Sequence, residues 1–196
     1  MKFIKINKKL SINNYKKPLL VAEISANHAG SKKKFLKHII EAKKSGAEII
    51  KHQTHLPYYE MSEEAKKIVP VHTKENIYEI IKKCALRISE EKKLKKFVES
   101  QKLTFISTPF SREAADQLNL MKVKAFKIGS GECNNYPLIE YICKFKKPII
   151  LSTGMNDIKS IKVACKIIEK HNINYALMHT TNLYPTPTNL IRLNSL

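Results

Sequence analysis

The stretch KPIILSTGMNDIKSIKVACKIIEKHNINYALMHTT, residues 147–181, decides the fold class. It opens with a short apolar run rich in β-branched residues (147–153) and continues with a longer amphipathic segment (157–171). It closes with a second apolar run (175–181). Strand-sized and helix-sized patterns in this order predict a βαβ unit, in which a helix joins two parallel strands.

The same alternation extends over most of the chain. Further strands are predicted at residues 18–24, 47–53, 103–108 and 124–130. Further helices are predicted at residues 31–46, 75–84, 89–101, 111–121 and 136–144. In the helix at 89–101, Leu94, Phe97 and Val98 recur at helical spacing, and Ser89 is placed as the N-cap. We predict a parallel α/β sheet wrapped by helices, either open or closed into a barrel, after a lead-in of residues 1–17.

One connection breaks this rhythm. Residues 54–74 show no strong pattern and carry His55, Tyr58, Tyr59 and His72 among two prolines. A loop of this length inside a compact domain usually has a function.

Length and composition limit the classes of protein to which this chain can belong. With 196 residues, 43% of them hydrophobic, the chain can build one substantial core. No apolar run suits a signal peptide or a membrane span, which predicts a cytoplasmic protein. The four cysteines lack C-x-x-C spacing, so we expect reduced thiols and no metal knuckle.

The net charge of +19 comes almost entirely from lysine, since only three of the 36 cationic residues are arginines. The lysines are scattered in pairs and triples over every segment. Arginine is the usual bidentate reader of bases and phosphates, and no nucleic-acid-binding motif is visible. We therefore expect a solvated lysine coat, with neither nucleic acid nor membrane as a partner.

Polar side chains follow the apolar part of each predicted strand. In chain order they are Glu23, Lys51, Gln53, Thr108, Lys127, Ser130, Ser152, Thr153, His179, Asn182 and Tyr184. Parallel strands point the same way, so their C-terminal ends share one rim, which is where (β/α)8 barrels carry their active sites. One such residue alone is more often an ordinary rim residue. The same feature on six strands predicts a functional site.

The residue types on this rim suit an anionic ligand. Lys51 and Lys127 supply two cations. Small hydroxyls come from Thr108, Ser130 and Ser152. The segments GSGE (129–132) and STGM (152–155) place glycines where backbone N–H groups can approach an anion, although an ordinary tight turn is the commoner meaning of such a segment. We predict a site for phosphate, or for phosphate plus carboxylate.

Three residues at the rim carry groups that can transfer protons or bind a metal ion. Glu23 and Glu132 are candidates for a general base or for binding sugar hydroxyls. His179 is a candidate metal ligand or proton carrier.

Six segments together resemble one known family. They are KHQTH (51–55), EMSEEAKK (60–67), ISTPFS (106–111), FKIGSGECNNYPLI (126–139), ILSTGMN (150–156) and HTTNLYPTP (179–187). In this order they resemble the sialic acid synthase family, most closely the bacterial N-acetylneuraminate synthases. The resemblance implies a (β/α)8 TIM-barrel fold, represented here by about six βα units as an incomplete barrel.

The resemblance also implies an activity. Phosphoenolpyruvate and open-chain N-acetylmannosamine would condense to N-acetylneuraminate and phosphate, for the cell-surface carbohydrate of a capsule or lipooligosaccharide. The family uses Mn2+, with Mg2+ or Co2+ as alternatives, and its full-length members are expected to form homodimers. An N-acetylated hexosamine is therefore the expected second substrate.

Roles carry over onto matching positions. Phosphoenolpyruvate would contact Lys51, Thr108, Lys127, Ser130, Ser152, Asn182 and Tyr184. The catalytic candidates are Glu23, Gln53 and Glu132. His179 would be one of two metal-ligating histidines, and His72 stands where relatives commonly place an asparagine against the sugar. Residues 23–30, EISANHAG, also depart from the family's Glu-Ile-Gly-Asn-Asn-His-Asn-Gly motif.

Family members extend further, with two more βα units, a second metal histidine and an antifreeze-like domain. We therefore expect residues 18–196 to be the N-terminal portion of such a barrel, with weak Mn2+ binding and little turnover alone. Two alternatives stay open. One is a Schiff-base aldolase or lyase that uses Lys127. The other is an inactive remnant that associates with a full-length subunit.

Overall fold

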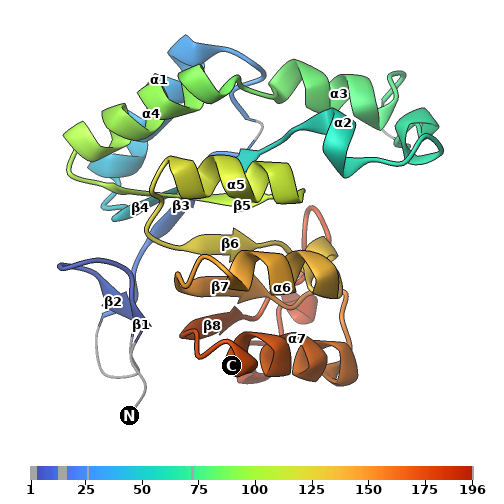
Figure 1. Cartoon of the computed structure of the whole chain (residues 1–196). Coiled ribbons are helices and arrows are strands. Elements are labelled where there is room, and N and C mark those ends of the chain that lie inside the picture. Colours follow the sequence, from blue (N-terminus) through green and yellow to red (C-terminus); the bar gives the residue numbers. More distant parts are fainter. Residues whose placement is uncertain (1–3, 13–16, 26, 72, 196) are drawn as a thin grey trace. The chain divides into compact units, whose positions relative to one another are not determined.

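The computed structural model describes residues 4–12, 17–25, 27–71 and 73–195. They divide into two compact units. Figure 1 shows the chain coloured by sequence, from blue at the N-terminus to red at the C-terminus. The first unit covers residues 17–123, and the second combines residues 124–195 with residues 4–12.

The first unit is built on three parallel strands. They are β3 (Val21–Glu23), β4 (Ile49–Thr54) and β5 (Thr104–Pro109). Its helices are α1 (Lys32–Lys44), α2 (Pro57–Glu60), α3 (Ile77–Cys84), α4 (Ile88–Ser100) and α5 (Arg112–Leu120), with a 3-10 turn η1 (Ala65–Lys67). The register pairs Glu23 with Lys51 and Gln53 with Thr108. Strand-end residues predicted from the sequence are therefore direct neighbours across the sheet.

The alternation of side chains along β4 decides which of its residues can reach a site. Successive strand residues point to opposite faces of the sheet. His52 packs among aromatic rings, with its centroid 5.2 Å from that of Phe35 on α1 and 6.2 Å from that of Phe105 on β5. Lys51 and Gln53 consequently project from the other face.

The helix starts follow local hydrogen bonding, and one of them corrects a prediction. Ser31 and Ser111 cap α1 and α5 through their side chains. The predicted cap of α4 at Ser89 is wrong, because Arg87 is the N-cap and Ser89 lies inside the first turn. The backbone N–H of Arg87 donates to Glu90 Oε2 at 3.1 Å, so a glutamate in the first turn fixes the start.

The second unit repeats the parallel arrangement. Its strands are β6 (Phe126–Ile128), β7 (Ile149–Ser152) and β8 (Tyr175–Met178), paired in parallel in chain order. Its helices are α6 (Tyr136–Cys143) and α7 (Ile158–Lys170), with the 3-10 turns η2 (Ser130–Glu132), η3 (Thr188–Leu190) and η4 (Leu193–Ser195). Figure 1 shows α6 and α7 side by side. β8 is less covered than its neighbours, with Leu177 48% and Met178 39% exposed.

The structure confirms the predicted strands and helices and adds short elements that the sequence pattern did not indicate. The lead-in contains an antiparallel pair, β1 (Ile4–Lys5) and β2 (Ser11–Ile12). The connection at 54–74 contains α2 and η1. The four cysteines form no disulfide. Every helix in the described part of the chain is too short or too polar to cross a membrane.

Candidate functional site

In the first unit, the strand ends bring an ion pair together. Lys51 Nζ on β4 donates to Glu23 Oε2 on β3, its neighbour in the register. The Lys51 side chain is 10% exposed and that of Glu23 is 44% exposed. The lysine is thus a nearly buried cation whose carboxylate partner stays in contact with solvent.

Gln53 is held on the same face of β4 by residues that the sequence analysis did not assign to the site. Its Oε1 accepts from Ser25 Oγ and lies 3.4 Å from His55 Nε2. His55 is fixed in turn, because its Nδ1 lies 2.9 Å from Glu60 Oε1 and its ring stacks on Phe110 at 4.3 Å. The side-chain amide of Gln53 is therefore oriented before any ligand arrives.

Thr108 stands beside Gln53 on β5 with an unused hydroxyl. Its residue is 1% exposed, and its Oγ1 has no hydrogen-bond partner among the described residues. A buried hydroxyl without a partner is costly, and a bound water or ligand commonly explains it. Thr108 is accordingly a ready donor or acceptor for a ligand.

In the second unit, a buried lysine lies on β6. Lys127 is 5% exposed, and its Nζ donates to Ser152 Oγ on β7 and to the carbonyl of Ile128, both at 2.6 Å. The pairing of β6 with β7 sets this contact. Lys127 and Ser152, which the sequence places on the same rim, are therefore joined by a direct hydrogen bond.

The two glycine-containing segments meet through a threonine that the sequence analysis left unassigned. Thr180 Oγ1 lies 3.0 Å from Ser130 Oγ and accepts the backbone N–H of Gly154 at 2.9 Å. Asn156 Nδ2 donates to the carbonyls of Ser130 and Gly154 at 2.8 and 2.7 Å. Gly154 is required here, because a Cβ atom at this position would lie 2.7 Å from the backbone carbonyl oxygen of Thr180 and 1.9 Å from Asn182 Oδ1. Ser130 is thus held by the loop after β7, and Asn182 lies close to the same loop.

The remaining predicted residues lie apart from these contacts. Glu132 accepts from Asn135 Nδ2 at 2.7 Å. Tyr184 is 90% exposed. His179 is exposed, and its Nε2 lies 2.8 Å from the carbonyl oxygen of Ile191. His72 lies outside the described residues.

His179 is the metal ligand that the resemblance implies in this chain. To donate to the carbonyl of Ile191, its Nε2 must carry the proton, so Nδ1 is the nitrogen that keeps a lone pair for a metal. The described part of the chain contains no cluster of three or more His, Cys, Asp or Glu side chains that could hold an ion. Mn2+ binding stays a prediction from the resemblance alone.

Comparison with known proteins assigns the family. The model of the NeuB family matches residues 38–196. This chain belongs to the NeuB family. It is 35% identical over 189 residues to the N,N'-diacetyllegionaminic acid synthase of Campylobacter jejuni, covering 92% of the chain and 56% of that relative. An uncharacterized protein of Methanocaldococcus jannaschii is 38% identical over 178 residues, covering 90% of the chain and 50% of that protein.

The fold comparison agrees with this membership. A sialic acid synthetase from Leptospira borgpetersenii superimposes with a TM-score of 0.86 at 24% identity, covering 99% of this chain and 64% of that one. The predicted (β/α)8-barrel type, with about six βα units present, is thereby confirmed. The chain spans about half the length of the curated NeuB relatives it matches.

Proposed function

We propose that this NeuB-family chain belongs to a synthase. The enzyme would condense phosphoenolpyruvate with an N-acetylated hexosamine and release a sialic-type acid and phosphate. N-acetylmannosamine, giving N-acetylneuraminate, is the substrate that we favour from the sequence motifs. Relatives named as legionaminic and pseudaminic acid synthases make a di-N-acetylated hexose the main competitor.

The observation that carries the proposal is the buried Lys127 ammonium against Ser152. Burying an ammonium group costs several kcal/mol unless charge or hydrogen bonds compensate for it. Here two hydrogen bonds hold the ammonium beside Ser152, and a buried cation in this position suits an anionic ligand. Ser130 and Gly154, which follow β6 and β7, add a hydroxyl and a backbone loop. Phosphoenolpyruvate, with a phosphate and a carboxylate, matches this chemistry.

The first unit carries its own set of groups for such substrates. Lys51 is a nearly buried cation and Thr108 has an unused hydroxyl, and both suit a phosphate or a carboxylate. Glu23 lies against Lys51 and is solvent-accessible, which suits a proton carrier. The oriented amide of Gln53 suits recognition of sugar hydroxyls or of an N-acetyl group.

Calorimetric titration of the 196-residue chain with phosphoenolpyruvate tests the proposal. We expect saturable binding, and we expect phosphate or pyruvate alone to bind more weakly. Lys127→Met should weaken phosphoenolpyruvate binding at least about tenfold, since charge-assisted hydrogen bonds are worth about 1.5–3 kcal/mol. Lys124→Met is the matched control, because Lys124 is exposed and lies three residues earlier.

Two outcomes would redirect the assignment. Borohydride trapping of pyruvate on Lys127 would support the Schiff-base alternative. A folded chain that binds no phosphoenolpyruvate would contradict the proposal and favour an inactive remnant. Saturation-transfer NMR with phosphoenolpyruvate present, comparing N-acetylmannosamine with a di-N-acetylated hexose, decides between the two sugars.

A further inference from the structure

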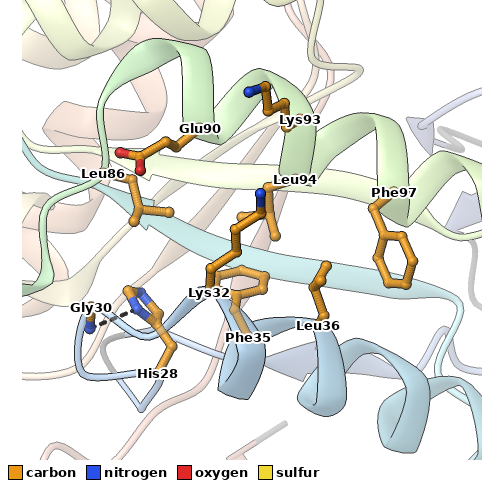
Figure 2. A pocket seen from close by; sticks show the side chains of 10 residues that line it. All are labelled: His28, Gly30, Lys32, Phe35, Leu36, Leu86, Glu90, Lys93, Leu94 and Phe97. Carbon is orange, nitrogen blue, oxygen red and sulfur yellow. Dashed lines mark hydrogen bonds between the residues drawn. The ribbon is translucent and has the colours of Figure 1, made fainter.

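A cavity lies between α1 and α4 in the first unit (Figure 2). Its volume is about 200 Å³. Its apolar lining consists of Phe35, Leu36, Leu86, Leu94 and Phe97. No strand-end residue assigned above lines this cavity, which makes it a separate feature of the molecule.

His28 places a polar group in this apolar lining. The residue is 1% exposed, its Nδ1 accepts the backbone N–H of Gly30 at 3.1 Å, and its ring centroid is 5.0 Å from that of Phe35. Burial, followed by the nearby charges of His52 and His38, lowers the pKa of His28 to about 4. The neutral ring therefore carries its proton on Nε2.

Cations border the same cavity. Lys32 and Lys93 line it, and neither forms a salt bridge within the part of the chain that the structure describes. In Figure 2 the Lys32 side chain extends from α1 toward Leu94 on α4. Glu90 also lines the cavity. Arg87 engages its carboxylate at 3.2 and 3.4 Å, and this contact, together with the nearby charge of Lys32, lowers the pKa of Glu90.

Helix α1 adds to this positive field. It begins at Lys32 and has no acidic residue in its first turn, so the partial positive charge of its N-terminus is not compensated within the helix. The cavity thus combines an apolar body, the His28 imidazole and a border of two lysines and one carboxylate that Arg87 engages.

The geometry points to a binding site for a small aromatic monocarboxylate in this cavity. A dry apolar cavity of about 150 Å³ is enough for a benzene ring, so about 200 Å³ accommodates one ring with a short substituent. The phenylalanine rings offer edge and face contacts to an aromatic body. The carboxylate would pair with Lys32 and Lys93 or accept from His28 Nε2.

Phenylacetate is the probe for this site, titrated into the 196-residue chain and followed by 15N amide NMR. We expect saturable shifts concentrated on the amides of α1, α4 and the loop at His28, with a dissociation constant of about 1–10 mM for a ligand of this size. Acetate and toluene serve as comparison probes, since the first lacks the ring and the second lacks the charge.

Two variants test separately the apolar cavity and the lysine charge at its border. Leu94→Phe fills the cavity and should abolish binding, and a dispersed amide spectrum confirms that this variant folds. Lys93→Met should weaken phenylacetate binding about two- to fivefold while leaving toluene binding unchanged. Lys92→Met is the matched control, because Lys92 is an exposed neighbour that does not line the cavity.

The site is refuted by non-saturable shifts spread over the chain, or by unchanged binding in a folded Leu94→Phe variant. Equal affinity for toluene and phenylacetate would overturn the assignment of an anionic ligand. None of these readouts depends on phosphoenolpyruvate or on turnover.

Discussion

Replacing Glu91 with alanine removes the acceptor at the centre of a buried network between α4 and the sheet of the first unit. Glu91 is 1% exposed and accepts from Gln117 Nε2 at 2.6 Å and from Thr54 Oγ1 at 2.9 Å. Its Oε1 also lies 3.2 Å from His52 Nε2. Thr54 keeps a second contact, since its Oγ1 lies 2.8 Å from Ser107 Oγ.

The loss in stability follows from the groups left without a partner. Alanine strands the buried Gln117 amide, at about 1–3 kcal/mol, and removes the carboxylate beside the His52 ring. We therefore expect Glu91→Ala to lower the free energy of unfolding by about 1–4 kcal/mol. Glu91→Gln keeps one acceptor oxygen, and the Gln117 amide can turn to accept from the new donor. Its expected cost is about 0.5–1.5 kcal/mol.

Urea unfolding followed by far-UV circular dichroism measures both variants against the parent chain. Lys92→Ala, at the exposed next position of α4, should stay within about 0.5 kcal/mol of the parent. The reasoning fails if Glu91→Ala costs no more than Lys92→Ala. It also fails if Glu91→Gln is as damaging as Glu91→Ala, because the network would then not depend on the acceptor oxygens.

Three further outcomes are expected. Because burial lowers the pKa of His28 to about 4, below its unfolded value, stability should be complete above about pH 6.5 and fall by about 2–3 kcal/mol as the pH drops toward 4. Urea unfolding at several pH values should show a smaller loss for His28→Asn, whose Oδ1 can accept the same N–H. A Cβ at Gly154 would lie 1.9 Å from Asn182 Oδ1, whereas one at Gly131 meets no atom within 4 Å. Titration should therefore show weaker phosphoenolpyruvate binding in Gly154→Ala than in Gly131→Ala, and equal affinities would contradict the role of Asn182. Burial raises the pKa of Cys143 to about 11, so mass spectrometry after iodoacetamide at pH 8 should find it modified only once urea is added.

Hydrophobic periodicity was sufficient to predict the main strands and helices, because each of them has an apolar face to bury. It could not indicate β1 and β2, which are two residues each and too short to show a period. The cap of α4 was mispredicted because serine is the better cap by residue type, whereas the Glu90 carboxylate decides the start.

The candidate site was predictable only in part, for a related reason. A polar residue after an apolar strand run is visible in the sequence, which identified Lys51, Lys127 and Ser152. The groups that contact Gln53 and Ser130 come from loops, where no periodicity exists. His55 contacts Gln53 and closely follows a predicted strand, whereas Thr180 contacts Ser130 and lies at the end of the strand predicted at 175–181. Those positions are the only sequence signals that could have found them.

The alternation along β4 links the stability of the first unit to its chemistry. Lys51 and Gln53 serve the candidate site, while the intervening His52 and the following Thr54 lie against Glu91 on the opposite face. A strand fixed on one face by a buried network holds the side chains of its other face in place. Glu91→Gln should then lower phosphoenolpyruvate affinity although Glu91 lies on the other side of the sheet. Titration of this variant at a temperature where it remains folded measures that effect, and an unchanged affinity would show that β4 holds Lys51 in place without the network.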